Sequence, residues 1–220
     1  ILHGYVVADD WHPREDHAER LRSVTTPWTL YTEHFIPAMD AFVKDGRIRS
    51  WGITALMRDA SIRALQHEHP PHVVQCIANP INSSGSMGIK GIEEDPQAIM
   101  EQAVTSGVGV MGIRAVAAGS LTDSLDRDMH PKSGEAKDFE RSARFRDYAD
   151  SIGESAASLA HRYALSLPNI DTVVLGVKNR VELAECLNAE KAECLTVAEM
   201  ESIQTGLLGV GGQHRCSPYS

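Results

Sequence analysis

Short apolar runs alternate along the chain with longer amphipathic stretches. The short runs are rich in Val and Ile and are bounded by Gly, Pro or charged residues, which is typical of buried strands. They predict strands over residues 2–7, 48–54, 72–77, 108–113 and 171–176. Apolar residues at helical spacing predict helices over 33–44, 58–68, 96–106, 136–165 and 180–187. The sequence Thr196-Val197-Ala198-Glu199 is a capping box that begins one more helix.

The alternation of strand and helix predicts a parallel sheet covered by helices, and therefore an α/β fold. No G-x-G-x-x-G follows a strand, which argues against a doubly wound nucleotide-binding sheet. A complete (β/α)8 barrel needs about 250 residues, and five strands do not close one. We therefore expect a partial TIM barrel over residues 1–208 that lacks its N-terminal strands, followed by a flexible tail over 209–220.

Two stretches interrupt this rhythm, and composition bounds the class of protein. Residues 9–32 predict a long loop with a short helix, and residues 79–91 predict a loop after a strand. The formal charge of −9, without a concentrated basic face, argues against a nucleic-acid partner. No apolar run is long enough to cross a bilayer. Four dispersed cysteines without metal-binding spacing predict free thiols and a cytoplasmic protein.

Candidate chemistry lies in four places. His3 is either a packed strand residue or a proton-transfer group. The loop over 9–17 holds carboxylates and imidazoles, but their irregular order favours a solvated loop over a metal site. The small residues over 107–121 allow close approach of a phosphate, or equally a tight turn. Lys178, Asn179 and Arg180 precede a helix, which favours phosphate binding slightly over an ordinary helix start.

In this order the segments resemble the C-terminal portion of the aldo-keto reductase superfamily, in its sugar-dehydrogenase-like branch. Leu2-His3 resembles the "LH" of the fourth barrel strand. Residues 44–54 resemble the family's "GKIRxIGxS" stretch. Gln75 and Asn79 match the "Q…N" of the sixth strand. Residues 107–121 resemble the cofactor loop after the seventh strand, and residues 174–185 resemble the "IpGxrxxxqlxeN" signature.

The resemblance implies an NADP(H)-dependent oxidoreductase, with NAD(H) as the other choice, that transfers hydride to or from the carbonyl or alcohol of a sugar or small aldehyde. His3 would be the catalytic histidine that orients the carbonyl, and no metal is implied. Thr54 and Gln75 would hold the nicotinamide carboxamide. The remaining cofactor-binding residues implied are Arg114, Val116, Gly119, Gly176, Lys178, Asn179 and Glu185. Lys178 and Asn179 would hold the 2′-phosphate.

Three positions depart from the family pattern: Ala55, Glu182 and Cys186. Glu182 would repel a 2′-phosphate. The family's tyrosine, lysine and aspartate belong to earlier strands, so we expect a complementing N-terminal segment or a homodimer. Two other readings stay open: a truncated relative acting as a lyase or isomerase through His3 and Arg114, or as a binding module, and a metal-dependent hydrolase built on the loop over 9–17.

Overall fold

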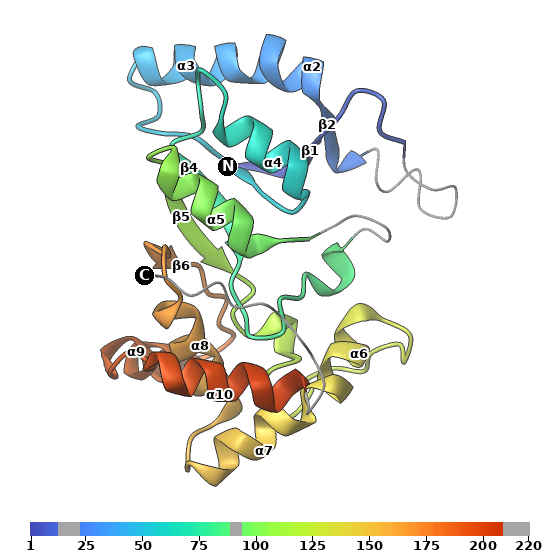
Figure 1. Cartoon of the computed structure of the whole chain (residues 1–220), viewed down its shortest axis with the longest axis vertical. Helices are drawn as coiled ribbons and strands as arrows, with labels where there is room; N and C mark the ends of the chain where they lie inside the picture. The colour runs from blue at the N-terminus through green and yellow to red at the C-terminus, as the bar shows by residue number, and fades with distance from the viewer. Residues whose placement is uncertain (13–22, 89–93, 209–220) are drawn as a thin grey trace. The chain divides into compact units, whose positions relative to one another are not determined.

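The computed structural model describes residues 1–12, 23–88 and 94–208 (Figure 1). These residues form two compact units that are interleaved along the chain. Unit 1 consists of residues up to 78 together with 87–114 and 167–175. Unit 2 consists of 79–86, 115–166 and the residues from 176 onward.

Unit 1 is built on a six-stranded sheet in which every neighbouring pair is parallel. The strands are β1 Leu2–Val7, β2 Thr25–Pro27, β3 Gly52–Thr54, β4 Val73–Ile77, β5 Gly109–Ile113 and β6 Thr172–Val173. Their order across the sheet is β2-β1-β3-β4-β5-β6. The α/β class with a parallel sheet is therefore confirmed.

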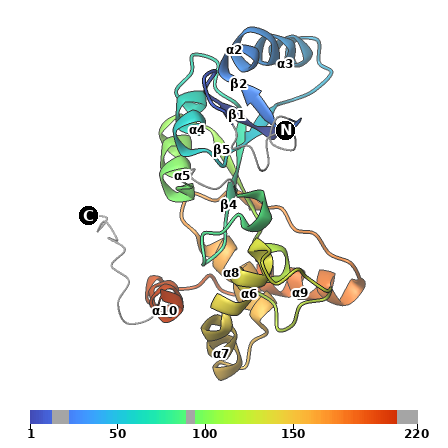
Figure 2. The same cartoon turned by 90° about the vertical axis from the view of Figure 1, so that its right-hand side faces the viewer.

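The helices of unit 1 pack their apolar residues against one side of this sheet. They are α2 Trp28–Leu30, the π-helix η2 Tyr31–Phe35, α3 Ile36–Lys44, α4 Arg58–Leu65 and α5 Pro96–Thr105. Helices α4 and α5 lie side by side (Figure 2). Strand residues Val6, Ile53 and Val74 enter one core together with helix residues Leu65 and Ile99. The alternation of a strand explains why their sequence neighbours face the other way.

The predicted strands lie where the sequence placed them. Two of them are much shorter than predicted, and one further strand was not predicted. The strand over 2–7 is confirmed, whereas the strands predicted over 48–54 and 171–176 keep only Gly52–Thr54 and Thr172–Val173. The stretch over 9–32, predicted to be a loop with a short helix, contains the strand β2 as well. Three residues ending in proline carry too little pattern to be recognised as a strand.

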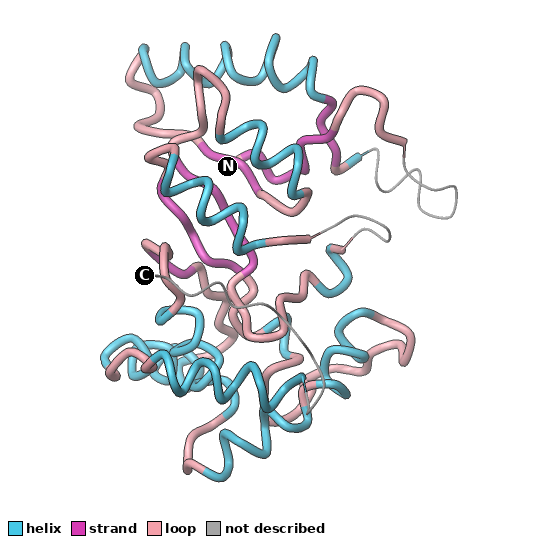
Figure 3. Tube along the Cα trace, viewed as in Figure 1, coloured by secondary structure: helices cyan, strands magenta, loops and turns pink. Residues whose placement is uncertain are grey.

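Unit 2 is helical (Figure 3). Its helices are the 3₁₀ turn η4 Ala117–Gly119, α6 Gly134–Arg141, α7 Ala143–Ser151, α8 Ala156–Ser166, α9 Arg180–Lys191 and α10 Val197–Leu208. A short 3₁₀ turn, η3 Gly85–Met87, lies where the chain passes between the units. No helix of the described ranges has the length and apolar character needed to cross a membrane.

The single helix predicted over 136–165 is wrong, because the segment forms α6, α7 and α8. The first break lies at Ser142, whose φ of −88° and ψ of 9° leave the α conformation. The second lies at Gly153, which has a φ of +71°. A left-handed residue ends a helix, and glycine adopts that conformation without steric cost.

Candidate functional site

Thr54 and Gln75 meet on the face of the sheet opposite to the main core. They are paired in the register of β3 and β4, and Thr54 Oγ1 donates a hydrogen bond of 3.3 Å to Gln75 Oε1. Thr54 is buried and Gln75 is half-buried. Their strand neighbours Ile53 and Val74 enter the core instead. Unit 1 thus places a hydroxyl and a carboxamide side by side on this face of the sheet.

His3 lies on the adjacent strand, inside an irregularity. Leu2 pairs with Ile53 and Tyr5 with Thr54, so the two residues between Leu2 and Tyr5 form a bulge in β1. Bulges often redirect a side chain beside an active site. The imidazole is exposed. His3 is the second residue of β1 rather than its last, since the strand continues to Val7.

Arg114 follows β5 directly and is also in unit 1. Its φ of +60° is left-handed, which is uncommon for a residue with a side chain. The side chain is half-buried. Strained backbone of this kind is concentrated at functional sites, where the surrounding fold holds it in place.

The predicted phosphate loop of unit 2 has a still more unusual backbone. Ala117, Ala118 and Gly119 are all left-handed, with φ of 47°, 54° and 96°. Val116 precedes them with φ −93° and ψ 15°. A right-handed residue followed by a left-handed one points successive N–H groups into one concavity, which binds anions. The loop therefore has a backbone conformation of the kind that can bind anions, although the Gly119 N–H already donates to Val116 O at 2.9 Å.

Arg127 and Asp126 together link this loop with the start of α9. A Cβ built on Gly119 would lie 4.0 Å from Asp126 Oδ1. Asp126 Oδ2 forms an ion pair with Lys178 Nζ. Arg127 completes the group, because its Nη2 donates to Ala118 O at 2.8 Å. Asp126 was missed from the sequence, since it lies 52 positions before Lys178 and no motif marks it.

The polar residues at and beyond the start of α9 form hydrogen bonds within the protein. Asn179 caps the helix, and Glu182 accepts hydrogen bonds from the residues before it. Glu185 accepts a hydrogen bond from Ser155 Oγ, which in turn accepts one from Ser158 N–H at 3.1 Å. Gly176 is exposed, and a Cβ there would meet no atom within 4 Å.

Cys186, which departs from the family pattern, faces His161 in the interior of unit 2. Its Sγ lies 3.6 Å from His161 Nδ1. Burial raises the pKa of the Cys186 thiol, and Glu185 raises it further. Burial also lowers the pKa of His161. Both groups are thus held neutral, so the pair is a packing contact and not a thiolate nucleophile.

The loop over 9–17 is described only as far as residue 12. Asp9 accepts hydrogen bonds from the N–H and the Oγ1 of Thr29, at 2.8 and 2.9 Å, which lower its pKa. It therefore fixes the start of the helical stretch that begins at Trp28. Across the described residues, no three His, Cys, Asp or Glu side chains gather closely enough to bind a metal ion. The rest of that loop lies outside the described residues.

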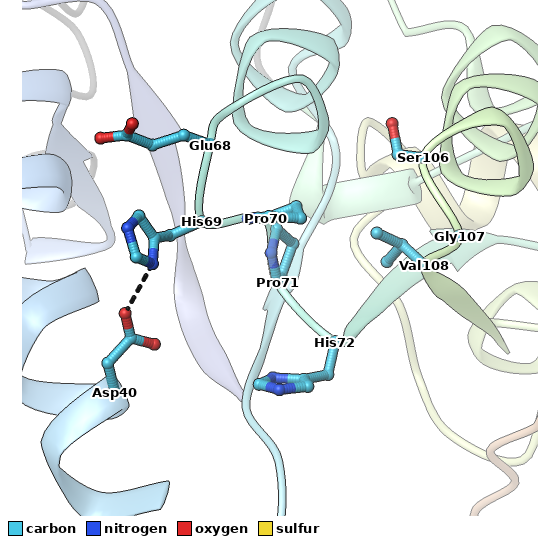
Figure 4. Close-up of a pocket in the computed structure, with 9 residues that line it drawn as sticks. All are labelled: Asp40, Glu68, His69, Pro70, Pro71, His72, Ser106, Gly107 and Val108. Atoms are coloured by element: carbon cyan, nitrogen blue, oxygen red, sulfur yellow. Dashed lines mark ion pairs between the residues drawn. The ribbon is translucent and has the colours of Figure 1, made fainter. Parts of the chain in front are cut away.

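A pocket of about 320 Å³ lies elsewhere in unit 1 (Figure 4). It is lined by His69, His72 and Val108, among others, which precede β4 and β5. His69 Nδ1 and Asp40 Oδ2 form an ion pair of 3.1 Å across it. Because Gln75 and Arg114 lie farther along these strands, the pocket is not part of the candidate site.

The predicted residues thus form two sets. Unit 1 holds His3, Thr54, Gln75 and Arg114, and unit 2 holds Val116, Gly119, Gly176, Lys178, Asn179 and Glu185. A sequence profile of the Aldo/keto reductase family matches residues 4–206. The chain belongs to this family. Its membership agrees with the resemblance seen in the sequence motifs.

Individual family members match the chain over much of its length. L-galactose dehydrogenase of Arabidopsis thaliana is 27% identical over 172 residues, which are 76% of this chain and 48% of that protein. The holo and apo structures of the aldo-keto reductase AKR11C1 from Bacillus halodurans match 79% of this chain at 18% identity, each with a TM-score of 0.61. The chain covers 55% and 56% of them, respectively. It therefore spans about half the length of these relatives, and the structural likeness shows the fold.

Proposed function

We propose that this chain binds a nicotinamide adenine dinucleotide and takes part in hydride transfer between the nicotinamide and a carbonyl or alcohol of a sugar or small aldehyde. The observation that carries the proposal is the left-handed loop over 117–119, which Arg127 and Asp126 link to the start of α9. Membership of the family supports the reaction type. The name of the Arabidopsis relative supports a sugar as substrate.

The chain's own residues have distinct tasks in this proposal. Thr54 and Gln75 would hold the carboxamide of the nicotinamide, which supplies or accepts the hydride when bound. The loop over 116–119 would hold the pyrophosphate through backbone N–H groups. Arg114, which follows β5, would add a positive charge. His3 would orient the substrate carbonyl and polarise it by donating a hydrogen bond.

Proton delivery to the carbonyl oxygen would belong to the family's tyrosine, with its lysine and aspartate. In this proposal these three residues are supplied by polypeptide other than the residues of this sequence. General acid catalysis typically contributes about 10²–10⁴-fold, so His3 alone would support little turnover. Free thiols at Cys76, Cys186 and Cys194 support a cytoplasmic setting.

The test is direct nucleotide binding, measured by calorimetry or by quenching of tryptophan fluorescence. Gln75→Met keeps the side-chain volume but removes the carboxamide, so we expect about tenfold weaker NADH binding and unchanged ADP-ribose binding. Gln66→Met, at an exposed position after α4, is the matched control and should change neither. Absence of binding of both NADH and NADPH at millimolar concentration would refute the proposal.

A further inference from the structure

The hydrogen-bond donors at the start of α9 are already occupied by the protein. Asn179 Oδ1 accepts from the N–H groups of Val181 and Glu182, at 2.9 and 3.0 Å. The Glu182 carboxylate accepts from Lys178 N–H at 2.8 Å and from Asn179 Nδ2 at 3.0 Å. A helix N-terminus attracts an anion through such donors. Here the anion is a side chain of the helix itself.

The neighbouring cations share one carboxylate or are exposed. Lys178 forms an ion pair with Asp126, whose other oxygen lies 3.4 Å from Arg127 Nη1. Arg180, the first residue of α9, is exposed. A single exposed cation contributes little to the binding of a partner in water. Glu182 is the negative charge that occupies donors at the start of the helix itself.

A carboxylate distinguishes between the two nicotinamide dinucleotides. It has acceptors only, so a ribose 2′-hydroxyl can donate to it, whereas a 2′-phosphate offers further negative charge and no compensating donor. Lys178 and Asn179, predicted to hold that phosphate, are instead paired with Asp126 and Glu182. The donor set does not fit a 2′-phosphate.

We propose that Glu182 makes this site selective for NAD(H) and excludes NADP(H). This inference rests on the proposed function, because it requires that a dinucleotide bind along the loop over 116–119 and the start of α9. It revises the expectation of NADP(H) that the family resemblance carries. Glu182 is thus a specificity-determining residue of the cofactor site.

The experiment compares NADH and NADPH binding by calorimetry in the full chain, together with 5′-AMP and adenosine 2′,5′-bisphosphate. We expect NADH to bind at least about tenfold more tightly than NADPH, and the two fragments to show the same order. Glu182→Gln removes the charge and keeps one of the two hydrogen bonds, since glutamine has a single acceptor oxygen where the carboxylate accepts through both. It should reduce the NADH preference by about tenfold.

Glu190→Gln, an exposed position near the other end of α9, makes the same charge change about 12 Å away and should leave the preference unchanged. Asp126→Asn releases Lys178 and should strengthen NADPH binding independently of the cap. Equal or tighter NADPH binding by the unmodified chain overturns the inference, and so do equal effects of the two glutamate substitutions. Failure of both dinucleotides to bind overturns the proposed function itself.

Discussion

Single residues decide the chemistry of the interior, and Cys76 in β4 is the clearest case. Its side chain is fully buried in the core of unit 1. Burial raises the pKa of this thiol from 9.0 to about 12. The folded state therefore keeps the proton that the unfolded state releases above pH 9. Stability from this group is fully present below pH 9 and is lost as the pH rises toward 12.

We expect the substitution Cys76→Ala to be less destabilising at alkaline pH than at neutral pH. Between pH 8 and pH 10.5 the difference in unfolding free energy between the native chain and Cys76→Ala should fall by about 2 kcal/mol, because each pH unit above 9 is worth about 1.4 kcal/mol. Urea unfolding at each pH, with a reductant present, measures this difference in free energy. Val74→Ala removes a neighbouring core side chain that does not titrate, so its difference should stay constant. A constant difference for both variants would contradict the prediction.

The limits of the sequence as a guide are clearest for the candidate site. Motifs located Thr54 and Gln75, and the register then placed them together. The pairing of Lys178 with Asp126 was beyond reach, because a contact between loops far apart in the chain depends on tertiary packing alone. The bulge around His3 was equally hidden, since strand periodicity does not reveal an irregular register.

Elements are predictable where local chemistry marks their ends. The capping box at Thr196 is confirmed: its Oγ1 accepts from Glu199 N–H at 3.3 Å, and the Glu199 carboxylate accepts from Thr196 N–H at 2.7 Å. Helix α5 begins at Pro96 as predicted, after the cap Asp95. The helix predicted to begin at Glu33 is preceded by helical turns that begin at Trp28. The π-helix η2 lies just before Pro37, and its different hydrogen-bond spacing allows for a residue that has no backbone N–H.

The cap of α5 gives a test at this scale. Asp95 Oδ1 accepts from Ala98 N–H at 3.0 Å. Asp95→Ala should lower the free energy of unfolding by about 1 kcal/mol, because it leaves that donor without its cap. Asp95→Asn retains the acceptor and should be close to the native chain in thermal and urea unfolding. If both variants lose the same stability, the ion pair of 3.7 Å with Arg58 matters instead of the cap.

At the scale of the whole molecule, the interleaving of the two units governs how the chain unfolds. The chain passes between them after residues 78, 86, 114, 166 and 175. If unit 2 unfolded alone, the segment over 115–166 would remain a loop closed at both ends by unit 1. A closed loop gains less entropy than a free chain. Separate unfolding is thereby disfavoured, and we expect one cooperative transition.

Two spectroscopic probes report the units separately. The three tryptophans, Trp11, Trp28 and Trp51, all belong to unit 1, whereas α6 to α10 in unit 2 give most of the helical circular dichroism. Leu65→Ala removes a buried side chain of unit 1 and should cost about 2–5 kcal/mol. Leu159→Ala, equally buried in unit 2, is its counterpart. Each should shift the urea transitions seen by fluorescence and by circular dichroism together. A shift of one probe without the other would show that the units unfold independently.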